Sequence, residues 1–199
     1  MILYVIRHGE TAWNKVRRLQ GQTDIPLAEE GIRLAKETGI GMKDIPIDLV
    51  ISSPLKRAVQ TAECITEGRN IPVLTDERIQ EISFGDWEGE SLIDSPVLPA
   101  DYKKQFYENP LYCEVPPHGE SVPQVIQRTA DFYQSLLADP AYQDKHILIS
   151  THGAAGRCFL CNFFEDKTDI WRGGVPKNCA VINGKSRILD FDRLYYTER

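Results

Sequence analysis

The chain has 199 residues, of which 42% are hydrophobic and 26% are charged, a balance typical of a folded domain with a substantial core. Its formal net charge of -6 excludes a general nucleic-acid-binding surface, because such surfaces are built from clustered Lys and Arg. A phosphate ligand would therefore have to be bound by a few local cations.

No apolar run approaches the roughly 18 residues that cross a bilayer, and the apolar run 1–6 is too short for the core of a signal peptide. The five cysteines are odd in number and widely scattered, unlike a disulfide framework. We therefore expect a cytoplasmic protein with reduced thiols that makes no membrane contact. Since repeats and linkers are absent, residues 1–199 should form a single domain.

Continuous apolar runs predict three buried strands, at residues 2–6, 48–52 and 146–150. Apolar residues with helical spacing predict helices at 27–38, 55–67 and 122–137. Strands that alternate with helices indicate an α/β fold, in this case a three-layer α/β/α domain with a mostly parallel central sheet.

Two further segments have their own patterns. Residues 179–183 and 187–191 flank a short Gly-containing turn and predict an antiparallel hairpin at the edge of the sheet. That edge is open to pairing with a second copy, so the sequence allows a monomer or a homodimer. Residues 91–118 are rich in Pro, Tyr and acidic residues and are expected to form an irregular excursion that covers a pocket.

Polar clusters follow the three predicted strands, and two of the clusters contain a His-Gly pair, at His8 and His152. The carboxyl ends of parallel strands meet at one edge of a sheet, so these histidines should face one crevice. Glycine allows a close approach by a ligand, and the free N–H groups of the following helix suit an anion. One such histidine alone is more often structural, but two in matching contexts favour a functional site.

Two arginines could supply the countercharge for a phosphate, because a guanidinium forms bidentate hydrogen bonds with phosphate oxygens. Arg7 ends a buried strand, where a charge requires a partner. Arg57 has an alternative interpretation, since an exposed arginine early in an amphipathic helix is ordinary.

The sequence around these residues resembles the signature of the histidine phosphatase, or phosphoglycerate mutase-like, superfamily. The matching blocks run in order from residue 3 to about residue 160, so the resemblance covers most of the chain. They are LYVIRHGETAWN (3–14), QG (20–21), DIPL (24–27), SSPLKRA (52–58) with QTA (60–62), Glu81 with FGDWEG (84–89), GES (119–121) and THG (151–153).

The resemblance implies that His8 attacks phosphorus and that Arg7, Arg57 and His152 neutralise the transferring group. It further implies that Glu81 protonates the leaving oxygen and then activates water. Asn14, Gln20 and Gly21 would bind the substrate in the same pocket. The resemblance implies no cofactor and no metal ion, because fixed cations and N–H donors can stabilise the phosphoryl group.

Glu81 is not distinguished by position alone, because Asp76, Glu77, Glu88 and Glu90 lie nearby and a solvated loop glutamate is the simpler interpretation. The nucleophile needs a neutral imidazole, so its other N–H should donate to an acceptor, which we expect to be a backbone carbonyl. The sequence does not identify that carbonyl.

The expected activity is that of a histidine acid-type phosphatase, a phosphoric monoester hydrolase for a small phosphorylated metabolite, and the WEG block resembles the phosphatase branch. A phosphoglycerate mutase is the first alternative, since a mutase differs by excluding water from phosphohistidine. An inactive phospholigand-binding or scaffold protein is the second, although such a protein is expected to lack His8 or Glu81. The physiological phosphomonoester stays open.

Three smaller expectations complete the sequence-based picture. His118 is expected on the surface, although substrate contact is an alternative. Cys158 and Cys161 resemble a redox pair in spacing, but their apolar neighbours favour buried core thiols. Ala28 stands where the family commonly has a Ser or Thr helix cap.

Overall fold

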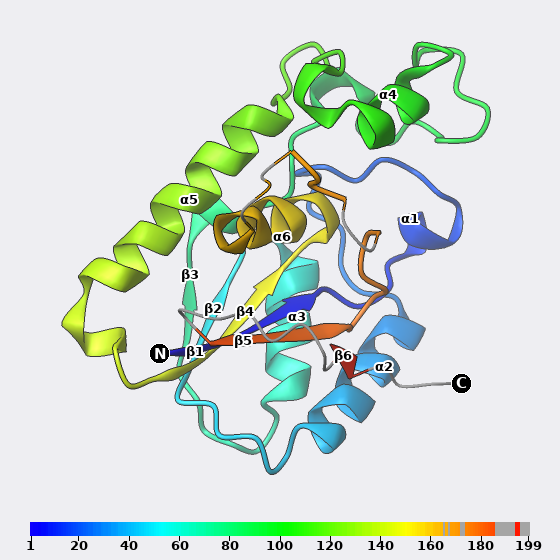
Figure 1. Cartoon of the computed structure of the whole chain (residues 1–199). Coiled ribbons are helices and arrows are strands. Elements are labelled where there is room, and N and C mark those ends of the chain that lie inside the picture. The colour runs from blue at the N-terminus through cyan, green and yellow to red at the C-terminus, as the bar shows by residue number, and fades with distance from the viewer. Residues whose placement is uncertain (165, 167, 172–173, 186–193, 196–199) are drawn as a thin grey trace.

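The computed structural model describes residues 1–164, 166, 168–171, 174–185 and 194–195. Figure 1 shows the arrangement of its helices around a central sheet. The strands are β1 (Ile2–Arg7), β2 (Leu49–Ser52), β3 (Val73–Thr75), β4 (His146–Thr151), β5 (Val181–Lys185) and β6 (Leu194–Tyr195). The helices are α1 (Ala12–Lys15), α2 (Glu29–Gly41), α3 (Lys56–Ile65), α4 (Tyr102–Glu108), α5 (Val122–Ala138) and α6 (Gly153–Leu160).

Within the described residues the sheet has six strands in the order β3-β2-β4-β1-β5-β6. The pairs β2–β3, β2–β4 and β1–β4 are parallel, whereas β1–β5 and β5–β6 are antiparallel. The mostly parallel sheet with antiparallel strands at the C-terminal edge is therefore confirmed. The predicted second strand of the hairpin, residues 187–191, lies outside the described residues.

Both faces of the sheet are covered, which explains why its strands are continuously apolar. Leu3 and Val5 of β1 pack in one cluster with residues of α5 and α6. Tyr4 and Ile6, which point to the opposite face, pack in a second cluster with residues of α2 and α3. This confirms the three-layer architecture.

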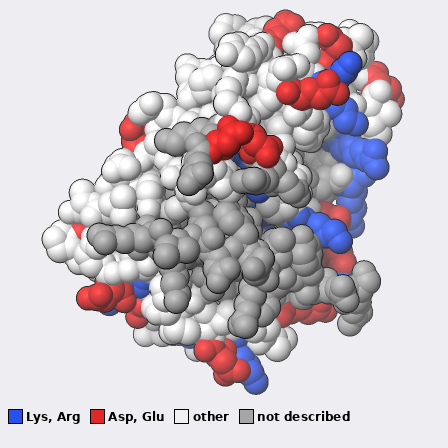
Figure 2. All heavy atoms as spheres, in the orientation of Figure 1, with Lys and Arg blue, Asp and Glu red and all other residues white. Residues whose placement is uncertain are grey.

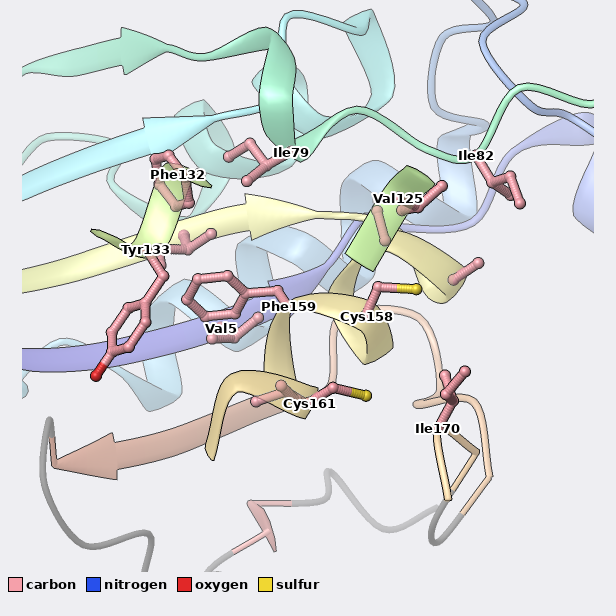
Figure 3. Packing of buried hydrophobic residues seen from close by; sticks show 14 of the residues in the cluster. Val5, Ile79, Ile82, Val125, Phe132, Tyr133, Cys158, Phe159, Cys161 and Ile170 are labelled. Atoms are coloured by element: carbon pink, nitrogen blue, oxygen red, sulfur yellow. The ribbon is translucent and has the colours of Figure 1, made fainter. Parts of the chain in front are cut away.

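Figure 3 shows the larger of these clusters, in which Phe159 of α6 lies among aromatic side chains of neighbouring helices. Its ring centroid is 5.9 Å from that of Phe132, 6.0 Å from that of Tyr133 and 5.6 Å from that of Phe163. Phe159 has no exposed surface. This packing holds α6 against α5 and so fixes the position of the helix that begins just after His152.

Helix α5 begins with a capping box in which Ser121 and Gln124 bond reciprocally. Ala28, the residue before α2, provides no side-chain cap. The expectation of an irregular segment at 91–118 was only partly right, because this segment contains α4. Tyr102 and Phe106 of α4 are buried against the core cluster, so tertiary packing stabilises a short helix that sequence periodicity does not reveal.

Candidate active site

Two adjacent strands bring the predicted histidines together. β1 and β4 pair in register with Arg7 opposite Thr151, so the residues that follow them, His8 and His152, are neighbours. Their ring centroids are 5.2 Å apart, and both side chains are buried. The carboxyl ends of β1 and β4 therefore bring the two predicted histidines side by side.

The backbone carbonyl that accepts from His8 is that of Gly9, at 2.6 Å from Nδ1. Because a carbonyl oxygen only accepts, Nδ1 carries the proton and Nε2 keeps its lone pair. Burial, and then the charges of Arg57 and Arg7, hold the pKa of His8 well below its usual 6.5. The imidazole is thus neutral at physiological pH, as a nucleophile requires.

His152 lies beside His8, behind the wall of the cavity described below. Its Nε2 is 2.8 Å from the hydroxyl of Ser53, which follows β2. Burial, followed by the charges of Arg57 and His8, also holds the pKa of His152 well below 6.5. Ser53 belongs to one of the polar clusters at the strand ends, but the sequence analysis did not include it in the site.

Both predicted arginines point into this region. Arg57 is fully buried and donates to the backbone carbonyls of Gly21 at 2.6 Å and Thr23 at 2.9 Å, so the alternative of an exposed helix arginine is wrong. Arg7 donates from Nη1 to the carbonyl of Pro176 at 2.7 Å. Burial lowers the pKa of both guanidiniums, but from a value so high that they stay charged at neutral pH.

Three buried side-chain nitrogens in the described part of the chain have no hydrogen-bond partner: Nε of Arg7, Nε of Arg57 and Nδ1 of His152. Buried polar atoms are nearly always satisfied, so three unpaired nitrogens on neighbouring residues call for a ligand. The two arginine Nε–H groups can only donate, so this ligand must carry acceptor atoms. They belong to the three residues that the sequence assigned to the phosphoryl group.

Glu81 is half-buried, and its carboxylate lies at the N-terminus of α6. The interpretation of Glu81 as a solvated loop glutamate is therefore wrong. Its carboxylate accepts from the backbone N–H groups of Gly153 at 3.0 Å, Ala154 at 3.3 Å and Ala155 at 2.9 Å. The expectation that these helix N–H groups are free for a phosphate was also wrong. The anion at the positive end of this helix is Glu81 itself.

The backbone that carries Glu81 is held by Arg128 of α5, which the sequence analysis missed. Its guanidinium donates to the carbonyls of Arg78, Gln80 and Glu81 at 2.8 to 3.0 Å. It also forms an ion pair with Glu120 at 2.9 Å. Glu120 belongs to the GES block of the family signature, and this block was the available signal.

A cavity of about 350 Å³ opens in front of these residues, within the size range of small-molecule sites. Asn14, Gln20 and Gly21, which the family resemblance assigns to substrate binding, line it. The wall on the other side includes α4, so residues from 91–118 do border the pocket. The remaining lining residues are Arg7, His8, Arg17, Arg18, Leu19, Arg57, Glu81, Phe84, Leu92, Tyr102, Lys103, Phe106, Tyr107, Gly153, Ala154, Trp171 and Val175.

The loop that carries the Gly21 and Thr23 carbonyls is held by Glu88. The Glu88 carboxylate accepts from the backbone N–H groups of Gln22 at 2.8 Å, Thr23 at 2.7 Å and Phe84 at 3.1 Å. Gly21 has a positive φ of 53°, and a Cβ at this position would lie 2.0 Å from the Glu88 carboxylate. Glycine is therefore required where the loop meets Glu88.

The residues that the sequence placed outside the site are indeed elsewhere. His118 is exposed and its Nδ1 lies 3.1 Å from the Asp86 carboxylate, as expected for a surface histidine. Cys158 and Cys161 are buried and form no disulfide, and burial raises the pKa of Cys158 well above 9.0. No group of three or more metal-ligating residue types gathers in the part of the chain that the structure describes.

Residues 3–187 match the histidine phosphatase superfamily, branch 1. The chain belongs to this superfamily. It is 36% identical over 192 residues to a Bacillus subtilis protein named uncharacterized phosphatase PhoE, covering 94% of this chain and 92% of that one. It is 35% identical over 179 residues to the Proteus mirabilis protein named probable phosphoglycerate mutase GpmB, covering 90% of this chain and 82% of that one.

Solved structures of histidine phosphatases share the fold. A mycobacterial glucosyl-3-phosphoglycerate phosphatase, in complexes with VO3, superimposes with a TM-score of 0.81 at 25% identity over 92% of this chain and 91% of that one. The similar proteins thus include some named phosphatases and some named phosphoglycerate mutases. None of the described helices of this chain is both long enough and apolar enough to span a membrane.

Proposed function

We propose that this protein hydrolyses the phosphomonoester of a small metabolite through a phosphohistidine on His8. The observation that carries the proposal is the set of unpaired nitrogens on Arg7, Arg57 and His152, next to a neutral imidazole. A phosphate group supplies oxygen acceptors for the Nε–H groups of Arg7 and Arg57 and can hydrogen-bond to His152. The proposal extends to a cytoplasmic location.

In the first half-reaction the Nε2 lone pair of His8 attacks phosphorus, and the bond from phosphorus to the ester oxygen breaks. The leaving oxygen takes the proton of Glu81, while Arg7 and Arg57 neutralise the charge on the phosphoryl oxygens.

In the second half-reaction the Glu81 carboxylate takes a proton from water, the water oxygen attacks phosphorus, and the bond to Nε2 breaks. Inorganic phosphate leaves, and Glu81 and His8 return to their starting states. The three N–H donors of α6 suit the carboxylate form that this half-reaction uses. One residue thus serves as acid and then as base.

The test is phosphate release from para-nitrophenyl phosphate between pH 5 and 8 with EDTA present. Wild type should turn over, and His8→Ala should lose about three orders of magnitude or more in kcat, because the nucleophile is gone. His118→Ala is the matched control, since its imidazole is exposed. Activity in His8→Ala equal to wild type would contradict the phosphohistidine mechanism.

A phosphoglycerate mutase is the second candidate, supported by the 35% identity to the relative named probable phosphoglycerate mutase. Phosphoglycerate as substrate separates the two activities: a phosphatase releases inorganic phosphate, whereas a mutase yields the isomer. An inactive binding protein is disfavoured, because His8 and Glu81 are both present on the cavity wall.

A further inference from the structure

The cavity is strongly cationic in a chain that is acidic overall. Its wall carries five cationic side chains and one carboxylate, Glu81, whereas the whole chain has 23 Lys and Arg against 29 Asp and Glu. Two of the cations, Arg7 and Arg57, lie at the inner end beside His8. The other three, Arg17, Arg18 and Lys103, are exposed, and we call them the rim cations.

The rim cations come from two segments far apart in the sequence. Arg17 and Arg18 follow α1, and Lys103 lies on α4. Figure 2 shows Lys and Arg side chains gathered at this edge of the molecule, on the right of the view, around the level of α1 and below α4. Only the folded chain places them around one opening.

The rim cations differ in their partners from several exposed lysines of this protein. Lys15, Lys36, Lys56 and Lys104 each form an ion pair with a carboxylate. Within the described residues, no carboxylate forms an ion pair with a rim cation. Arg18 donates instead to the carbonyl of Gly89 at 2.5 Å. Among the residues that the structure describes, no side chain therefore neutralises the charge of the rim cations.

Arg17 also has a costly backbone conformation, with φ at 53°. Left-handed backbone is uncommon in residues other than glycine and gathers at functional sites. Its carbonyl accepts from the N–H of Leu92, so this conformation ties the Arg17 turn to the segment that precedes α4. The two segments that provide the rim cations are thus joined near the cavity mouth.

The transferring phosphoryl group does not require the rim cations, because Arg7 and Arg57 already balance a dianion at the inner end. We propose that Arg17 and Lys103, with Arg18 beside them, bind a second anionic group, a carboxylate or a phosphate, on the leaving-group side of the substrate. The substrate is then a phosphomonoester that carries a second acidic group. This inference rests on the proposed function, since both groups belong to one ester.

The test uses three-carbon phosphomonoesters that differ only at the far end, namely glycerol 3-phosphate, 3-phosphoglycerate and glycerol 1,3-bisphosphate. Their dissociation constants are measured by calorimetry with His8→Ala, which cannot form phosphohistidine, so binding is read without turnover. The two acidic esters should bind about tenfold more tightly than glycerol 3-phosphate, as two exposed ion pairs correspond to roughly two- to thirtyfold. The preference should shrink as salt is raised.

Arg17→Asn combined with Lys103→Ala should remove the preference and leave binding of glycerol 3-phosphate within about twofold. Asn is chosen because it tolerates the left-handed backbone at this position. Lys104→Ala is the matched control, since Lys104 pairs with Glu108 and does not line the cavity. It should keep the full preference, and thermal unfolding confirms that each variant is folded.

The outcomes separate the two proposals. If His8→Ala binds glycerol 3-phosphate as tightly as the two esters with a second acidic group, while wild type hydrolyses all three, the rim inference is overturned and the proposed phosphatase activity stands. A preference that survives Arg17→Asn/Lys103→Ala also overturns it. Failure of all three esters to bind overturns both proposals. If only glycerol 1,3-bisphosphate binds tightly, the rim cations bind a phosphate. If only 3-phosphoglycerate binds tightly, they bind a carboxylate.

Discussion

Glu88 provides the sharpest test of how the loop behind the site is built. Its carboxylate accepts from the backbone N–H groups of Gln22, Thr23 and Phe84 and from the Thr23 hydroxyl. The loop that it holds presents the carbonyls of Gly21 and Thr23 to Arg57. Glu88→Gln keeps the shape of the side chain but replaces one acceptor oxygen by an NH2 group, which faces N–H donors.

Losing one hydrogen bond to a charged group costs about 1.5–3 kcal/mol. Glu88→Gln should therefore lower the free energy of unfolding by about 2–3 kcal/mol, measured by urea unfolding. For a chain of this size each kcal/mol corresponds to about 2–4 °C in Tm, so the melting temperature should fall by about 4–12 °C. A small displacement of Arg57 should also lower kcat/KM, up to about a hundredfold.

Asp86→Asn is the matched control. Asp86 lies two residues from Glu88, and among the described residues its carboxylate hydrogen-bonds only to the exposed His118. Its unfolding free energy should stay within about 0.5 kcal/mol of wild type. If Glu88→Gln unfolds like Asp86→Asn and keeps full activity, the loop does not depend on the carboxylate and our account of Arg57 placement is wrong.

Three further predictions concern the core and the buried histidines. Burial and nearby arginines lower the pKa of His8 and His152, so below pH 6.5 the unfolded chain takes up protons that the folded chain does not. The free energy of unfolding should therefore fall with decreasing pH by up to about 1.4 kcal/mol per pH unit for each histidine. Urea unfolding from pH 7.5 to 5.5 should show a shallower dependence of this free energy on pH for His8→Gln/His152→Gln, and an unchanged dependence would refute the reasoning. Phe159→Ala should cost about 3–5 kcal/mol in unfolding free energy, and a loss below 1 kcal/mol would mean that the aromatic cluster is not essential. Cys158 should react with a thiol reagent only after denaturation, and rapid labelling of the native protein, located by peptide mapping, would contradict its burial.

The positions of His8, His152 and Arg7 were predictable because each follows or ends a strand that periodicity identifies. The parallel pairing of β1 with β4 then places both histidines at one edge. Arg57 was ambiguous from local pattern, since a helix position does not reveal what covers it. Its burial depends on the loop at residues 20–23, which folds over it.

Glu81 shows where local reasoning stops. Five other acidic residues lie within ten positions of it in the sequence, and only the family signature distinguished it. In the structure its carboxylate meets N–H groups more than 70 residues away, and Arg128, which is 47 residues away, holds its carbonyl. No periodic pattern encodes such contacts.

The sequence by itself determined the strands and helices, the mostly parallel sheet and the residues at the strand ends. These features follow from short-range rules, since side-chain periodicity reports which faces are buried. Only the tertiary structure decided that Glu81 rather than a ligand sits on the N–H groups of α6, and that Arg17, Arg18 and Lys103 surround one opening. The physical reason is that these arrangements depend on packing between segments far apart in the chain, where side-chain volume and long-range hydrogen bonds, rather than local spacing, select the geometry.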